Sequence, residues 1–220
     1  MNGVFPWGYT PLFFAVDHTP LVMPRKFFEK PQPDQGDRVP PGQYLAKGFP
    51  VLSYGETPQI STDDWLLKVW GLVEKRSFDW SDLMNLPQQD FTADFHCVTR
   101  WSKLDVQWTG VKVTDFLDAI ALDPKATHIL QHCYGGYTTN LALTDFARPE
   151  NFFAHTLNGE PLPPDHGGPL RLVVPHLYAW KSSKWINGIE FLDYEQEGFW
   201  ERNGYHLRGE PWAEERYAGR

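Results

Sequence analysis

The sequence contains only two cysteines, Cys97 and Cys133, in 220 residues. Two thiols are too few for a disulfide-stabilised scaffold, for an iron–sulfur cluster held by four thiolates or for a tetracysteine zinc site. The sequence also has no C-x-x-C-H motif, which excludes a covalently attached c-type haem. Each cysteine therefore has to be judged by its own surroundings.

Positive charge and long apolar runs are also scarce. The chain has 20 Lys and Arg against 28 Asp and Glu, which gives a formal net charge of -8. Nucleic acids and anionic membranes require clustered positive charge, so neither is expected as a partner. No apolar run approaches the ~18 residues of a membrane span, and the first residues lack the pattern of a signal peptide. We therefore expect a soluble, cytoplasmic protein.

Glycine and proline are abundant, with 18 and 19 residues, and 15% of all residues are aromatic. This composition indicates many turns and an aromatic-rich core, and it is not typical of a helical bundle. Residues 1–48 include "EKPQPDQGDRVPPGQY", which favours extended backbone over helix. We expect an N-terminal arm over 1–48 and one domain over 49–220.

Period-two alternation and turn signals predict a mostly-β domain with short helices. In Asp90–Val98, apolar and polar residues alternate, which places Cys97 at a strand end facing the core. Because the strands do not alternate regularly with helices, the fold class is α+β rather than a doubly wound sheet. The expected strands are 65–73, 90–98, 127–133, 136–143, 170–175 and 185–193, with a hairpin at Asn158-Gly159 and helices at 78–87 and 113–122.

The stretch "DFHCVTRWSK" gives one cysteine a basic neighbourhood. Arg100 and Lys103 follow Cys97, and nearby positive charge favours the thiolate, which binds soft metals. His96 and Cys97 point to opposite faces of an extended strand, so they cannot share one metal without a bend. A lone buried cysteine is also a common core residue. A disulfide with Cys133 is a further alternative that a cytoplasmic setting disfavours.

A second stretch, "PPDHGGPLRLVVP" with "KSSKW" beyond it, collects groups that bind anions. His166 and Arg171 flank a Gly-Gly-Pro turn ahead of a predicted strand, and Lys184 lies beyond that strand. Arg offers a bidentate fork for phosphate, Lys a point charge, and a Gly/Ser turn lets backbone N–H groups approach an anion. An anionic cofactor fits this set. The alternative is a solvated turn with a hydrogen-bonded histidine.

Taken together and in this order, "FHCVTRWS", "LPPDHGGPLRLVVP" and "KSSKWINGIEF" resemble the molybdopterin-binding domain of the sulfite oxidase family. The similarity is greatest to the small single-domain bacterial branch of that family, and it extends from about Phe49 to Tyr217. The resemblance implies a sulfite oxidase-type molybdopterin-binding fold. It also implies oxidoreductase activity and a cofactor of molybdenum with one molybdopterin.

The resemblance assigns roles to residues at matching positions. Cys97 matches the cysteine whose thiolate binds the molybdenum. Tyr137 matches an active-site tyrosine near the oxo ligands, with a half-buried strand aromatic as the alternative. Arg100, Lys103 and Lys181 are expected to attract an oxyanionic substrate. The residues expected to bind the pterin and its phosphate are Leu52, Ser53, Tyr54, Cys133, His166, Arg171, Ser182, Ser183 and Lys184, with His132 as the alternative to Cys133.

One departure from the family pattern limits the functional prediction. Sulfite oxidases follow the cysteine with "AGNRR", whereas this chain has "VTRWS". The small-molecule substrate is therefore left open between an oxyanion and a sulfoxide-like compound. No haem segment accompanies the motifs, so an external electron-transfer partner is implied.

The leading hypothesis is an enzyme that transfers an oxygen atom in two-electron steps, with the molybdenum performing the difficult chemistry. The second hypothesis is a catalytically inactive cofactor-binding or interaction module of the same fold. The third is a zinc protein or hydrolase that uses some of the 8 histidines. Metal analysis separates the first two hypotheses from the third.

Overall fold

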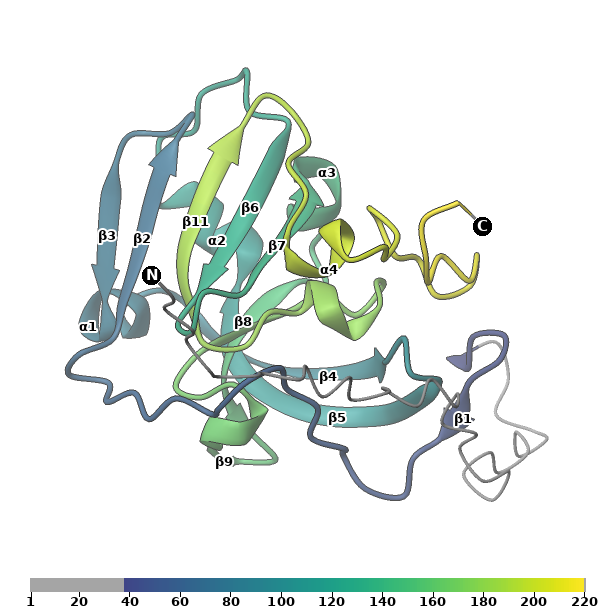
Figure 1. Ribbon diagram of the computed structural model, residues 1–220. Coiled ribbons are helices and arrows are strands. Elements are labelled where there is room, and N and C mark those ends of the chain that lie inside the picture. The colour runs from purple at the N-terminus through teal and green to yellow at the C-terminus, as the bar shows by residue number, and fades with distance from the viewer. Residues whose placement is uncertain (1–37, 220) are drawn as a thin grey trace, which may run out of the picture.

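The computed structural model describes residues 38–219, which form two β-sheets that share a core (Figure 1). Sheet A consists of β1 (Tyr44–Leu45), β4 (Gln88–His96), β5 (Trp101–Lys112), β8 (Phe152–Leu157), β9 (Glu160–Pro161) and β10 (Arg171–Val173). Sheet B consists of β2 (Leu66–Gly71), β3 (Arg76–Asp79), β6 (His128–Cys133), β7 (Thr138–Ala142) and β11 (Ile186–Leu192). The helices are α1 (Trp80–Met84), α2 (Val113–Asp118), α3 (Leu143–Phe146) and α4 (Phe199–Arg202), with 3-10 turns η3 (Pro164–His166) and η4 (Ala179–Lys181).

The strand order is mixed in both sheets. Sheet A runs β1-β5-β8-β10, with β4 paired to β5 and β9 to β8, and sheet B runs β3-β2-β11-β6-β7. The pairs β1/β5 and β11/β2 are parallel, and the remaining pairs are antiparallel. Because parallel pairs need long crossovers, they bring distant parts of the chain together. Residues 38–48 reach the edge of sheet A in this way.

Alternation along the strands divides the core between the two faces of sheet A. Val111 and Phe153 are fully buried against the inner face of sheet B, where Val69 and Phe191 lie. The opposite face of sheet A buries a second cluster, which includes Trp108, Phe152 and Cys97. The adjacent β8 residues Phe152 and Phe153 thus pack into different clusters, because successive side chains of a strand point to opposite faces. The second cluster is the one that carries the candidate site.

The expected α+β class is confirmed, with many strands and few short helices. The strand β5 was not anticipated, although it pairs with β1, β4 and β8. The helix expected at 113–122 ends at Asp118 instead. The end of the predicted helix instead pairs with residues 72–73. Leu122 forms an antiparallel β-bridge with Val73, and the Asp123 N–H donates to the Leu72 carbonyl at 3.0 Å. Backbone pairing with another segment therefore replaces the final helical turn.

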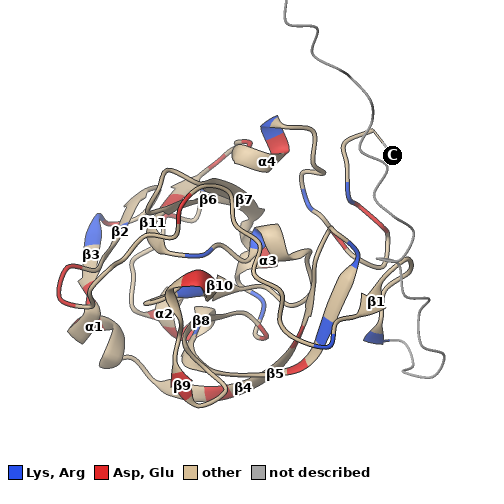
Figure 2. Cartoon of the chain, turned by 60° about the horizontal axis from the view of Figure 1, so that its bottom comes forward, with Lys and Arg blue, Asp and Glu red and all other residues tan. Residues whose placement is uncertain are grey.

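The N-terminal end of the described chain packs on sheet A. Arg38 forms ion pairs with Asp94 and Asp105, each at 2.6 Å, and β1 adds to the edge of β5. Acidic and basic residues are interspersed over the sheets and loops (Figure 2). None of the helices in residues 38–219 combines the length and apolar character needed to cross a bilayer. The division at residue 48 stays a prediction, and most of the expected arm lies outside the described residues.

Candidate functional site

Cys97 is the residue directly after β4, and it begins a turn that leads into β5. Its side chain is buried, with an exposed fraction of 7%. The Thr99 hydroxyl donates a hydrogen bond to its Sγ at 3.1 Å. Both cysteines are free thiols, so the disulfide alternative is excluded by the structure.

The electrostatic surroundings of Cys97 contain two opposing effects. Burial raises the pKa of the thiol, whereas the hydrogen bonds from Thr99 and the positive charges of Arg216 and Lys184 lower it. Burial prevails, so the pKa of the metal-free thiol lies above its ordinary value. A metal cation at Sγ would supply additional positive charge and so favour the thiolate.

Arg171 brings a buried cation to the same side of the fold. It lies on β10 with 2% of its surface exposed, and its guanidinium carbon is 4.9 Å from the ring centre of Phe95. Its Nη1 donates to the His166 carbonyl at 2.8 Å, and its Nη2 donates to the Ser182 carbonyl at 2.9 Å. Burial lowers the pKa of Arg171 to about 9. The side chain thus joins two of the segments that the sequence assigned to the pterin.

Lys184 connects the same region to the loop that follows residue 50. Its Nζ donates to the carbonyls of Asp165 at 2.6 Å and Leu52 at 3.0 Å, and to the Ser53 hydroxyl at 3.0 Å. Burial and the charge of Arg171 lower the pKa of Lys184 to about 8. The sequence candidates Leu52 and Ser53 are therefore brought next to Lys184.

The remaining pterin candidates lie around this group in different ways. Ser182 accepts a hydrogen bond from the Val174 N–H at 2.9 Å, and the Ser183 hydroxyl donates to Gln131. Cys133 is buried beside Ser183, and burial raises its pKa to about 12. Tyr54 is 72% exposed and packs against Phe199, with 4.8 Å between ring centres.

The candidates for substrate contact are not gathered at one point. The Tyr137 hydroxyl donates to the Trp180 carbonyl at 2.7 Å, so its hydrogen is committed to the backbone. Arg100 is exposed on the turn after Cys97, with a left-handed φ of 77°. Lys181 is fully buried and pairs with Glu201 at 2.6 Å, which overturns its expected attraction for an oxyanion.

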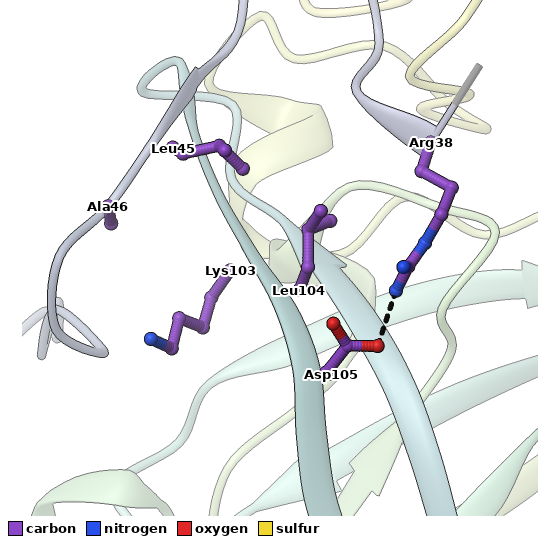
Figure 3. Close-up of a pocket in the computed structure, with 6 residues that line it drawn as sticks. All are labelled: Arg38, Leu45, Ala46, Lys103, Leu104 and Asp105. Atoms are coloured by element: carbon purple, nitrogen blue, oxygen red, sulfur yellow. Dashed lines mark hydrogen bonds and ion pairs between the residues drawn. The ribbon is translucent and has the colours of Figure 1, made fainter. Parts of the chain in front are cut away.

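Lys103 lies in a different hollow. With Arg38, Leu45, Ala46, Leu104 and Asp105 it lines a cavity of about 370 Å³ between the N-terminal segment and β5 (Figure 3). Its Nζ donates to the Lys47 carbonyl at 3.4 Å. Cys97, His166 and Arg171 do not line this cavity, so it is separate from the candidate cofactor site.

Tyr205 packs against the cluster that contains Cys97, and it was not among the candidates from the sequence. It follows α4, stacks on Trp200 with 4.9 Å between ring centres, and meets the Trp180 ring edge-on at 5.1 Å. Burial and the neighbouring Tyr217 and Cys97 raise the pKa of Tyr205. Its segment, "GYHLRGEPW", shows no periodicity that could have marked it.

The side chains gathered here fit a thiolate-bound metal carried by an anionic cofactor. Arg171 and Lys184 are cations that form no ion pair with a carboxylate within residues 38–219, and an uncompensated buried charge is costly. The indole N–H groups of Trp101 and Trp108 are buried in the Cys97 cluster without acceptors. An anion with several oxygen and nitrogen atoms satisfies both requirements.

The described residues contain no cluster of side chains that supports the zinc alternative. His128 and His132 have H-x-x-x-H spacing, which on a helix would place both rings on one face. They lie on β6 instead, and four strand residues span roughly 13 Å. In the part of the chain that the structure describes, no three His, Cys, Asp or Glu side chains come together to hold a metal.

The sequence profile of the family described as "Oxidoreductase molybdopterin binding domain" matches residues 54–200. The chain belongs to this family. It is 45% identical over 188 residues to the uncharacterized oxidoreductase YuiH of Bacillus subtilis, a match that covers 84% of this chain and 95% of YuiH. Sulfite oxidases are among its further relatives, which confirms the resemblance seen in the motifs.

Two further similarities are to a curated relative and to a solved structure. It is 31% identical over 157 residues to the protein-methionine-sulfoxide reductase catalytic subunit MsrP of Gluconobacter oxydans, which covers 63% of this chain and 50% of MsrP. The sulfane dehydrogenase SoxCD of Paracoccus pantotrophus shares the fold, with a TM-score of 0.61 and 19% identity over 91% of this chain and 60% of that one. The protein is therefore a molybdenum-cofactor oxidoreductase, and its cofactor is molybdenum with molybdopterin.

Proposed function

We propose that the thiolate of Cys97 binds the molybdenum and that the protein transfers an oxygen atom to or from a small sulfoxide-like or oxyanionic substrate. The observation that carries this proposal is the buried thiol of Cys97 within reach of the positive charges of Lys184 and Arg216. Molybdenum with molybdopterin supplies the two-electron redox chemistry and the exchangeable oxygen when it is bound. In the reductive direction a sulfoxide takes up two electrons and two protons, its sulfur–oxygen bond breaks, and a thioether and water leave. The oxidative direction is the reverse of this reaction.

The pterin and its phosphate are assigned to the cationic groups around Arg171. Arg171 and Lys184 neutralise the anion, and His166 and the backbone at Ser182 and Ser183 orient it. Leu52, Ser53 and Tyr54 would contribute to the same binding site, together with Cys133, which lies beside Ser183. The hydrogen bonds of Lys184 to Leu52 and Ser53 support this arrangement, since they join the loop to the cationic side.

The side chains around the thiol favour a sulfoxide-like substrate over a bare oxyanion. Tyr54, Phe199, Trp200 and Tyr205 form a continuous series of ring contacts at this edge of the fold. Aromatic faces bind the apolar substituents of an organic sulfoxide, while a bare oxyanion gains little from them. The relative MsrP, by its name a methionine-sulfoxide reductase, acts on a substrate of this class.

Proton delivery is assigned to Tyr205, with Tyr137 as the candidate from sequence. Reduction of a sulfoxide requires two protons at the departing oxygen, and the Tyr205 hydroxyl, protonated at neutral pH, is a donor packed against the cluster that contains Cys97. Arg100 adds an exposed positive charge beside Cys97 that can orient the substrate oxygen. The two electrons are exchanged with an external redox partner.

A dye-linked assay tests this proposal. The purified holoenzyme is supplied with a reduced one-electron dye and a panel of organic sulfoxides, N-oxides and oxyanions. We expect sulfoxide-dependent oxidation of two dye molecules per product, and Cys97→Ala should abolish it. A molybdenum-loaded protein that turns over none of the panel in either direction would favour the alternative, an inactive cofactor-binding or interaction module of the same fold.

A further inference from the structure

The turn that carries Cys97 is closed by local backbone bonds. The Cys97 N–H donates to the Trp101 carbonyl at 2.8 Å, and the Arg100 N–H donates to the Cys97 carbonyl at 3.0 Å. The left-handed φ of Arg100, 77°, lets the chain reverse direction within these residues. None of these bonds uses the Val98 carbonyl. The turn is therefore incompletely fixed by its own backbone.

Gln43 reaches this turn from the N-terminal side. Its side chain is 1% exposed, and its Nε2 donates to the Cys97 carbonyl at 3.0 Å. The segment is held in place because the Tyr44 N–H donates to the Arg100 carbonyl at 2.9 Å. The Cys97 carbonyl thus accepts two hydrogen bonds, one of them from a residue 54 positions away. A buried hydrogen bond of this kind is costly to leave unmade.

Arg216 reaches the same turn from the C-terminal side. Its Nη1 donates to the Val98 carbonyl at 2.7 Å, and its Nη2 donates to the Pro41 carbonyl at 3.3 Å. The side chain is 7% exposed, and its guanidinium carbon lies 4.8 Å from the ring centre of Tyr178. Because the guanidinium is planar and rigid, one side chain fixes the position of Val98 relative to Pro41.

We propose that Gln43 and Arg216 are positioning residues that together set the orientation of Cys97 toward the molybdenum. The inference rests on the proposed function, in which Cys97 is the metal ligand. The two side chains hold consecutive carbonyls of the Cys97 turn, so they fix the backbone from which Sγ projects. Loss of the groups that orient a metal ligand lowers metal affinity or activity by roughly 10- to 100-fold. The segments around Gln43 and Arg216 are on this account parts of the active site.

The test uses full-length holoenzyme with Gln43→Leu or Arg216→Met. We expect kcat per bound molybdenum to fall roughly 10-fold or more, with KM changed less than about 3-fold, because the substrate pocket is retained. The electron paramagnetic resonance spectrum of the one-electron-reduced metal should change in both variants, since it depends on the geometry of the sulfur ligand. Arg216→Lys keeps a cationic donor and should restore part of the wild-type spectrum.

Hydrogen exchange in the cofactor-free protein tests the same positioning role without the metal. In the cofactor-free full-length protein, hydrogen exchange at the amides of residues 98–101 should be faster in both variants than in the wild type. Arg208→Gln is the matched control. Arg208 lies in the same C-terminal segment as Arg216, but its side chain pairs with Asp145 at 2.9 Å. In Arg208→Gln, the electron paramagnetic resonance spectrum, kcat per bound molybdenum and amide hydrogen exchange at residues 98–101 should resemble those of the wild type.

The outcomes separate this inference from the proposed function. A wild-type spectrum and wild-type kcat per molybdenum in both Gln43→Leu and Arg216→Met would overturn the positioning role and leave Cys97 as the ligand. Failure of both variants to fold would also overturn it, because the contacts would then be purely structural. Retention of molybdenum and its native spectrum in Cys97→Ser would instead overturn the proposed function.

Discussion

The ammonium group of Lys181 lies 2.6 Å from the carboxylate of Glu201, and both side chains are fully buried. The same Nζ donates to the carbonyls of Asn140 and Leu207. Glu201 also accepts hydrogen bonds from Thr139 and from the Trp180 indole. This pair ties the segment after α4, which carries Tyr205 and Arg216, to β7 and η4.

Removing one partner of this pair should be strongly destabilising. We expect Lys181→Met to lower the free energy of unfolding by about 3–5 kcal/mol, because it leaves the Glu201 carboxylate buried without its cation. Urea unfolding followed by tryptophan fluorescence measures the change. Lys68→Met, at an exposed position on β2, is the control and should change stability by less than about 0.5 kcal/mol. A loss below about 1 kcal/mol for Lys181→Met would show that the pair is not an anchor.

His96 should make the protein sensitive to acid. Burial lowers its pKa to about 4 in the folded protein, from an ordinary value of 6.5. The unfolded chain then binds more protons between these two values, so stability is complete above pH 6.5 and falls as the pH drops toward 4. The pKa difference corresponds to about 3 kcal/mol. In His96→Gln, the slope of unfolding free energy against pH in this interval should be smaller, and an unchanged slope would contradict the assignment.

Lys184 should retain the cofactor rather than take part in the chemistry. Lys184→Met removes a charge-assisted contact, which weakens anion binding by roughly 10- to 100-fold. Molybdenum per chain after dialysis should fall, while dye-linked activity per bound molybdenum stays nearly unchanged. Lys103→Met, in the separate cavity beside β5, should keep its molybdenum. Full occupancy with lost activity would place Lys184 in the substrate site instead.

Removal of the hydroxyl should have different effects at Tyr205 and Tyr137: mainly on kcat at the first and mainly on stability at the second. Tyr205→Phe should reduce kcat by about 100-fold or more at unchanged molybdenum content, because it removes the proton donor near Cys97. Tyr137→Phe loses a hydrogen bond to the Trp180 carbonyl and should mainly lower stability, by about 1 kcal/mol. Steady-state kinetics and thermal unfolding of both variants decide the matter. The reverse pattern would return the catalytic role to Tyr137.

Local patterns in the sequence predicted much of the fold, and the motifs predicted the family. The alternation around Cys97 and the turn between His166 and Arg171 are short-range features, so they are readable without a structure. The strand β5 was not predicted because its alternation is broken at Asp105, where the φ is 55°. Opposite this point, the pairing of β4 with β5 shifts register between Ala93 and Phe95. Such irregularities depend on the neighbouring strand.

Contacts between distant segments were the part that the sequence could not show. Lys181 reads as a surface lysine, and only the fold reveals that Glu201 is buried against it. Tyr205 and Arg216 lie in a segment with little regular structure, and their approach to Cys97 depends on how that segment packs on the Cys97 turn and its cluster. Side chains of this kind are placed by tertiary packing, which has no local sequence signal.

Molybdenum content in cysteine variants tests the central claim most directly. Wild type, Cys97→Ser and Cys133→Ser are produced in cells able to synthesise molybdopterin, and the metal per chain is measured by mass spectrometry. The account predicts loss of most of the metal in Cys97→Ser, and close to one molybdenum per chain in the wild type and in Cys133→Ser, because the account assigns Cys133 to the pterin side and not to the metal, and serine nearly preserves its shape. Wild-type molybdenum content and an unchanged metal spectrum in Cys97→Ser would contradict it.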